Sequence, residues 1–104
     1  FFMVYNKLVR DKIPQIIEAQ GEKTVTRVLG GEEFHAALEQ KLLEEAAEYR
    51  ESHDLTELAD ILEVVYALCL ADGHTLGELG AAYAEKHGER GGFADKIFLV
   101  SKST

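Results

Sequence analysis

Two pairs of acidic residues, each with a spacing of three, stand on either side of a short break in the sequence. Glu45 and Glu48 precede the break at Ser52-His53-Asp54. Glu57 and Asp60 follow it at similar distances. Because three residues turn an α-helix by about 300°, both members of a pair point to nearly the same side. If the two helices fold back antiparallel, all four carboxylates meet at one level. Oxygen-only ligands favour Mg²⁺ or Mn²⁺ over zinc, so the pattern predicts a divalent-metal site.

Helical periodicity places these acids beside apolar side chains. In the first segment Glu45 falls within the apolar arc that contains Leu38 and Leu42, and Glu48 lies on its flank. The second segment is apolar in most directions, and its one acidic stripe consists of Glu57, Asp60 and Glu63. Isolated carboxylates on such a helix are costly unless they are neutralised, paired or bound to metal. The ordinary alternative is a set of solvated or salt-bridged acids, for which Lys41, four residues before Glu45, is a suitable partner.

Composition narrows the classes of partner. The chain has 104 residues and a net charge of −8, which predicts one domain over residues 1–104 and disfavours nucleic acid or an anionic membrane as a partner. A domain this small would gain stability from self-association. The single cysteine, Cys69, fits a reducing compartment, so we expect a cytoplasmic protein. The longest apolar run, Val64 to Ala71, is too short to span a bilayer. Phe1 and Phe2 precede the sole methionine and are left out of the expected fold.

Turn and capping residues predict the order of the elements. We expect four helices, the first capped by Asp11 and ended by Gly21, with Pro14 in its first turn. Short strands are expected where β-branched and apolar residues cluster. The helices cover about Asp11–Ala19, Glu32–Arg50, Leu55–Ala71 and Leu76–Lys86, and the strands Thr24–Leu29 and Lys96–Val100, which could pair as a small ribbon.

The motifs resemble those of a known family. Glu44-Glu45-Ala46-Ala47-Glu48 followed by Glu57-Leu58-Ala59-Asp60 is similar to the EExxE…ExxD signature of MazG-like, all-α nucleoside triphosphate pyrophosphohydrolases. The segment Tyr5 to Pro14, YNKLVRDKIP, resembles the start of a small branch called phosphoribosyl-ATP pyrophosphohydrolase-like, and the resemblance continues through Glu89 to Phe93. Only eight residues separate Glu48 from Glu57, fewer than is usual in the wider family, which predicts a trimmed loop near the substrate. The resemblance implies a mainly α fold, a four-helix MazG-like bundle with a small two-stranded β appendage.

The resemblance also implies a reaction. Members of this family cleave a nucleoside triphosphate between the α and β phosphates, using Mg²⁺, with Mn²⁺ as a possible substitute, to neutralise the triphosphate and activate water. The implied metal ligands are Glu45, Glu48, Glu57 and Asp60. Glu44 and Glu63 are candidates to orient or deprotonate the water. The candidates for binding substrate are Asn6, Lys7, Arg10, Lys86, Arg90 and Lys96.

Alternatives stay open at this point. The resemblance implies a homodimer or homotetramer. It also implies that the substrate is a non-standard nucleotide, which the enzyme removes from the nucleotide pool (house-cleaning), or else phosphoribosyl-ATP. A helical binding or assembly module without catalysis is a second class of function. A di-iron carboxylate bundle normally needs two Glu-x-x-His motifs, and only Glu32 and His35 fit that spacing.

Overall fold

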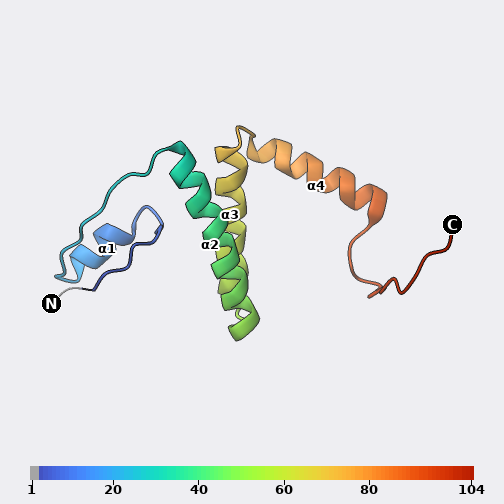
Figure 1. The fold of residues 1–104 in the computed structure, drawn as a ribbon, viewed down its shortest axis with the longest axis horizontal. Helices are drawn as coiled ribbons and strands as arrows, with labels where there is room; N and C mark the ends of the chain where they lie inside the picture. The colour runs from blue at the N-terminus through green and yellow to red at the C-terminus, as the bar shows by residue number, and fades with distance from the viewer. Residues whose placement is uncertain (1–2) are drawn as a thin grey trace.

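The chain forms four helices, joined by short turns in its second half and by longer segments in its first. The computed structural model describes residues 3–104 and is mainly helical, as expected (Figure 1). The helices are α1 Ile13–Ala19, α2 Gly31–Ser52, α3 Leu55–Ala71 and α4 Leu76–Arg90. In this part of the chain, no helix combines the length and apolar character that a membrane crossing requires.

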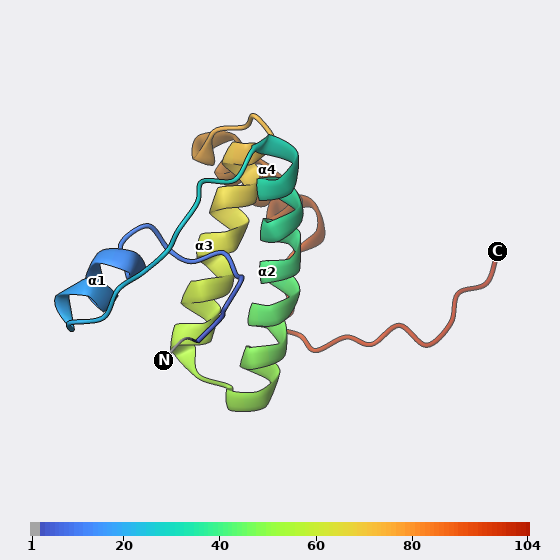
Figure 2. The same cartoon turned by 60° about the vertical axis from the view of Figure 1, so that its left-hand side comes forward.

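A two-residue turn folds α3 back along α2. His53 ends α2 in the left-handed conformation, with φ 55°, and its N–H donates to the Tyr49 carbonyl over 2.7 Å. Asp54 then begins α3, because its carboxylate accepts a hydrogen bond of 3.1 Å from the Thr56 N–H. The turn is shorter than the expected Ser52-His53-Asp54 break, and α2 continues to Ser52. The antiparallel hairpin that the acid spacing requires is therefore present (Figure 2).

Helix packing is concentrated in this hairpin. Among residues 3–104, the apolar side chains that are buried are Leu38, Val64 and Cys69. Helix α4 contacts only α3, and α1 contacts no other helix. The molecule is elongated, 62 × 32 × 24 Å, and α4 extends away from the hairpin (Figure 1). The expected four-helix bundle thus has its four helices, but a single chain does not pack them together.

Helix α1 differs from the prediction at its start. Its N-cap is Lys12, without a side-chain cap, so the expected capping by Asp11 is wrong. Pro14 lies in the first turn as predicted, where its missing N–H costs nothing. Gly21 follows the helix with φ 88°, a left-handed conformation that glycine adopts without strain.

The two expected strands are not formed within residues 3–104. Residues 24–29 and 96–100 have no strand pairing, and they lie on opposite sides of the hairpin in Figure 1. Val25 and Val28 are 101% and 98% exposed, and Ile97 is 84% exposed. A strand needs a hydrogen-bonded neighbour, and α4 carries the second segment away from the first. The β-branched composition was therefore insufficient to form a ribbon within one chain.

Helix α4 has the best-capped N-terminus of the structure. The Thr75 hydroxyl accepts from the Glu78 N–H over 3.1 Å, and the Glu78 carboxylate accepts from the Thr75 N–H over 3.2 Å. The helix runs to Arg90, one turn beyond the predicted end at Lys86, and Gly91 stops it with φ 77°. The capping box fixes where α4 begins, while the turn before it sets its direction.

A histidine joins α2 to the end of α3. His35 Nδ1 lies 3.0 Å from Glu39 Oε1, and His35 Nε2 lies 2.7 Å from Asp72 Oδ1. A neutral imidazole donates from one nitrogen only, so two carboxylate partners favour the doubly protonated ring. Hydrogen bonds to Asp72 and Glu39 raise the pKa of His35 above its ordinary value. The ion pairs hold the end of the hairpin that faces α4.

The stability of this contact should depend on pH. Because the pKa of His35 is raised, its contribution is complete below the ordinary histidine value of about 6.5 and is lost as the pH rises through the folded-state value. Between about pH 6 and 8, the melting temperature of the protein should fall more steeply than that of His35→Gln. Circular dichroism melts at matched ionic strength measure this difference. His87→Gln is the control, and equal slopes for His35→Gln and the unsubstituted protein would contradict the ion-pair role.

Candidate metal centre

Three carboxylates from the two helices of the hairpin converge. One oxygen from each of Glu45, Glu57 and Asp60 lies within 4.8 Å of the other two. Glu45 comes from α2, and the other two come from the first turns of α3, three residues apart. Two oxygens on opposite sides of Mg²⁺ are about 4.2 Å apart, twice the bond length of about 2.1 Å, so small side-chain rotations would close the set around one ion. The hairpin thus brings together three of the four predicted ligands.

Buried oxygens without partners distinguish this cluster from a solvated acidic surface. Glu45 is 7% exposed, and its Oε2 atom is buried with no hydrogen-bond partner. Glu57 Oε2 is likewise buried and without a partner. A buried carboxylate oxygen that nothing satisfies is costly, and a bound cation would remove that cost. The residues present therefore fit a hard divalent ion.

The electrostatics of Glu45 reflect its position. Burial raises the pKa of the Glu45 carboxyl above its ordinary value, and the neighbouring Glu48 carboxylate raises it further. The charge of Lys41 opposes this shift, while that of Asp60 adds to it. Glu48 is exposed and lies outside the three-oxygen cluster, although it is close enough to act on Glu45. The predicted ligand Glu48 is therefore near Glu45 but not among the converging oxygens.

Two cations reach the cluster. Arg10, from the segment before α1, donates to Asp60 Oδ1 over 2.7 Å. Lys41 Nζ, one helical turn before Glu45 on α2, lies 3.5 Å from Glu45 Oε1. The Arg10 contact ties the N-terminal segment to α3, although fifty residues separate the partners. Both carboxylates thus have a positive neighbour.

The other predicted site residues lie in different parts of the chain and not at one site. Asn6 and Lys7 line a hollow beside α2 together with Glu44, which is exposed. Glu63 is exposed and makes no hydrogen bond or ion pair within residues 3–104. The cations of the second half, Lys86, Arg90 and Lys96, make no contact of either kind with the acid cluster. Lys86 and Arg90 instead line a separate hollow of about 490 Å³ at the far end of α4. One chain therefore does not bring these three residues to the acids.

Some residues near the centre were not predicted as part of a site. Leu8, Ala37, Gln40 and Lys41 line the same hollow as Asn6 and Lys7. The sequence did contain a signal that the lining residues of α2 lie together, because residues 37, 40, 41 and 44 follow the spacing of one helical face. Lys41 was identified only as an ion-pair partner of Glu45. That Leu8 lies opposite this face depends on the path of the N-terminal segment, which the sequence did not predict.

Comparison with known proteins identifies similarity over part of the chain. No family profile matches the chain, and no solved structure matches it. An uncharacterized protein of Mycolicibacterium smegmatis is 52% identical over 44 residues, which is 42% of this chain and 45% of that protein. The chain thus spans less than half the length of this relative.

Replacing the buried Glu45 should have opposite effects on stability in the absence and in the presence of metal. Because the pKa of Glu45 is raised, its protonated form stabilises the fold at low pH, and this contribution is lost as the pH rises through the raised value. Near neutral pH in EDTA, Glu45→Gln should therefore raise the free energy of unfolding by about 1 kcal/mol, since glutamine removes the buried negative charge and its amide can donate to a neighbouring carboxylate. Mn²⁺ at about 100 times its Kd should stabilise the unsubstituted protein by about 2.7 kcal/mol and Glu45→Gln hardly at all.

Urea denaturation followed by circular dichroism measures both effects. The matched control is Glu44→Gln, which changes an exposed neighbour and should show neither effect. A loss of stability of Glu45→Gln in EDTA, or an unchanged response of it to Mn²⁺, would contradict the metal centre.

Proposed function

We propose that this chain is a metal-dependent nucleoside triphosphate pyrophosphohydrolase of the MazG-like kind. The observation that supports this most is the buried, unpartnered oxygen of Glu45 within a cluster of three carboxylates. An ordinary surface cluster would leave its oxygens to water. The two cations beside the cluster suit a polyanionic substrate, because phosphate binding needs positive side chains near the metal.

The chain's own residues divide the work. Glu45, Glu57 and Asp60 would hold the ion, with Glu48 at the edge, and Mg²⁺ or Mn²⁺ when bound would neutralise phosphate charge and lower the pKa of water. Arg10 and Lys7 bind phosphate oxygens. Glu44 would accept a proton from the attacking water as the bond between the α and β phosphates breaks. The products are a nucleoside monophosphate and pyrophosphate.

Glu63 follows Asp60 by one turn on α3 and keeps its proposed role beside the water. Lys86, Arg90 and Lys96 make no contact with the acids of their own chain, so their predicted roles require a second copy. We propose that they act at the site of a partner chain. The proposed substrates are non-standard nucleotides that the cell removes, with phosphoribosyl-ATP as the alternative, and the proposed location is the cytoplasm. The reaction needs neither nucleic acid nor a membrane as a partner.

Replacing a ligand tests the reaction. Asp60→Asn should lower kcat by at least about 100-fold, since an amide oxygen binds a divalent cation more weakly than a carboxylate does. The assay measures pyrophosphate and orthophosphate separately, for canonical, deoxy and modified nucleoside triphosphates and phosphoribosyl-ATP, with Mg²⁺, Mn²⁺ or EDTA. Asp95→Asn, an exposed position remote in sequence from the cluster, is the control.

The outcomes separate the alternatives. Metal-dependent pyrophosphate with an equal amount of monophosphate supports the proposal and ranks the substrates. No product from any nucleotide with either metal favours a binding or assembly module. Full activity in Asp60→Asn, whose helical signal should be unchanged, would overturn the assignment of the ligands.

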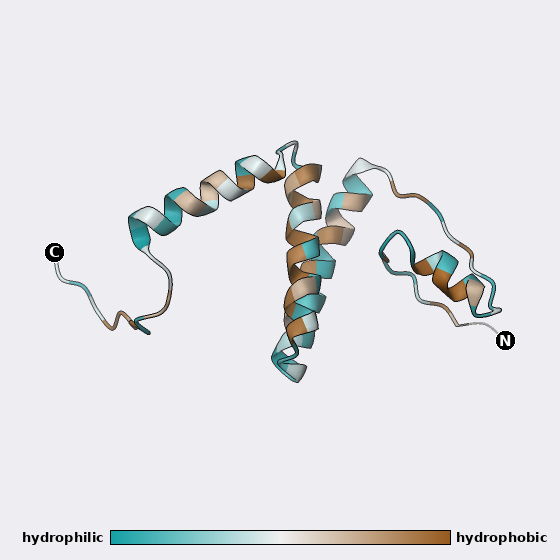
Figure 3. Cartoon of the chain, turned by 180° about the vertical axis from the view of Figure 1, so that it is seen from behind, coloured by the Kyte–Doolittle hydropathy of each residue, from teal (hydrophilic) through white to brown (hydrophobic). Residues whose placement is uncertain are grey.

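The exposed apolar face of α3 supports a homo-oligomer. Leu58, Leu62 and Tyr66 are 44%, 48% and 37% exposed, and they recur at helical spacing with Leu55 and Leu70. Hydrophobic residues follow much of α3 in Figure 3. We propose that a second copy covers this face, as a homodimer or within a homotetramer, so that two hairpins complete the four-helix bundle. Each chain then forms one domain of the assembly.

A charge on this face should separate the copies. Leu62→Glu should give a monomer in light scattering at concentrations where the unsubstituted chain is a dimer or tetramer, because an isolated buried carboxylate is costly at an apolar interface. Thr56→Glu adds the same charge to α3 away from the stripe and should leave the mass unchanged. A monomeric unsubstituted chain would refute the proposed oligomer.

A further inference from the structure

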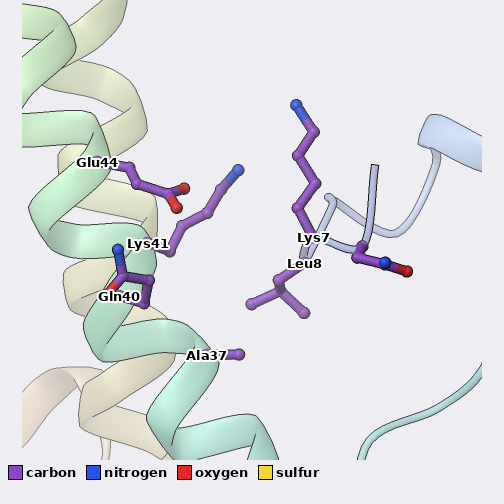
Figure 4. A pocket seen from close by; sticks show the side chains of 7 residues that line it. Lys7, Leu8, Ala37, Gln40, Lys41 and Glu44 are labelled. Carbon is purple, nitrogen blue, oxygen red and sulfur yellow. The ribbon is translucent and has the colours of Figure 1, made fainter. Parts of the chain in front are cut away.

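A hollow lies between the N-terminal segment and one face of α2, and it shares Lys41 with the ion pair of the acid cluster. It has a volume of about 190 Å³, room for roughly six water molecules at about 30 Å³ each. This size suits a pyrophosphate group. The lining side chains are Asn6, Lys7, Leu8, Ala37, Gln40, Lys41 and Glu44 (Figure 4).

The lining favours a phosphate over a nucleobase. It contains no aromatic ring on which a base could stack, and Leu8 and Ala37 are its only apolar side chains. Two lysines face one carboxylate, that of Glu44, in a chain whose net charge is −8. The amides of Asn6 and Gln40 can donate to further oxygens, because neither makes a hydrogen bond within residues 3–104.

Lys41 belongs to both the hollow and the acid cluster. Its ammonium group lies 3.5 Å from Glu45 Oε1, a long ion pair, and its side chain is 21% exposed. Figure 4 shows the ends of Lys41 and Lys7 extending into the space between α2 and the N-terminal segment. The flexible four-carbon stem allows the Lys41 ammonium to turn from the carboxylate to the hollow.

A cation at the cluster would compete with this ion pair. A divalent ion on Glu45 replaces the ammonium as the carboxylate's positive neighbour and repels it. We propose that the hollow is the subsite for the pyrophosphate product, and that Lys41 is a substrate-binding residue that exchanges from Glu45 to phosphate when the metal binds. Lys7 is the second cation of this subsite.

The exchange couples the two binding events. Metal on Glu45 frees Lys41 for phosphate, and phosphate that holds Lys41 leaves Glu45 free for metal. Coupling of this kind is reciprocal in free energy. The identity of the pyrophosphate as a product rests on the proposed function, whereas binding of inorganic pyrophosphate does not require turnover.

Titration calorimetry on the full chain tests the exchange with two probes, Mg²⁺ alone and magnesium pyrophosphate in excess Mg²⁺. Lys41→Gln should weaken pyrophosphate binding about tenfold, because a charge-assisted contact is lost. The same variant should bind Mg²⁺ alone about two- to fivefold more tightly, because a competing cation is removed. Lys7→Gln should weaken pyrophosphate binding without changing Mg²⁺ binding. Lys41→Arg should restore the pyrophosphate affinity that Lys41→Gln loses. Lys12→Gln is the control and should change neither affinity.

The opposite changes in the two affinities of Lys41→Gln, weaker for pyrophosphate and tighter for Mg²⁺, separate a binding role of Lys41 from a structural one. A variant that merely disturbs α2 would weaken both probes, and that result overturns the proposal, as does unchanged pyrophosphate binding by Lys41→Gln. Absence of Mg²⁺ binding by the unsubstituted chain would overturn it together with the metal centre. Pyrophosphate binding with the predicted signs, but no hydrolysis of any nucleotide, would uphold the subsite and refute the proposed function alone.

Discussion

Packing α2 against α3 across a two-residue turn buries the Glu45 carboxylate, and much of the surrounding structure compensates for that cost. Glu45 is 7% exposed, with Asp60 and Glu57 facing it from α3. Three carboxylates so close together repel one another, and burial strengthens the repulsion because water no longer screens it. Burial is the main cause of the raised pKa of Glu45, and the Glu48 and Asp60 carboxylates raise it further. A hairpin that keeps such a cluster between its two helices is poorly explained by stability alone.

The compensation comes from two places in the sequence. Lys41 lies on the same helix as Glu45, so its ion pair forms as soon as the helix does. Arg10 reaches Asp60 from a segment that is otherwise joined to the hairpin by few contacts. The Arg10–Asp60 ion pair is short, but both side chains are partly exposed, 52% and 37%, so solvent screens it. The N-terminal segment is therefore held at the site by an interaction that metal or phosphate can alter.

The parts outside the hairpin have little packing of their own. Helix α4 begins at a well-formed capping box and contacts only α3, and Tyr83 near its middle is 64% exposed. Ile97, Phe98, Leu99 and Val100 are likewise exposed beyond it. Apolar surface of this extent in so small a chain is typical of a protomer whose partner covers it. The same arrangement carries Lys86 and Arg90 away from the acids of their own chain.

The sequence by itself determined the local structure. Leu55–Ala71 was predicted to its bounds and confirmed, because Asp54 caps it and Asp72-Gly73 ends it, and these signals act between near neighbours. The position of Glu45 on the buried side of α2 followed from helical periodicity, which is also local, whereas the convergence of the acids also required the antiparallel packing of α2 and α3. Asp11 was wrongly chosen as a cap because several polar residues precede Ile13, and propensity does not choose between adjacent positions.

Only the tertiary structure decided which residues far apart in the sequence lie next to one another. Contacts between residues far apart in sequence form the hollow between Leu8 and Ala37 and bring Arg10 to Asp60. The direction of α4 depends on such contacts as well. The strands expected at 24–29 and 96–100 show the same limit, because a strand forms only where a neighbour supplies its hydrogen bonds. Helix caps and periodicity act within a few residues, so the sequence shows them directly. Long-range pairing depends on the path of the whole chain, which no local pattern contains.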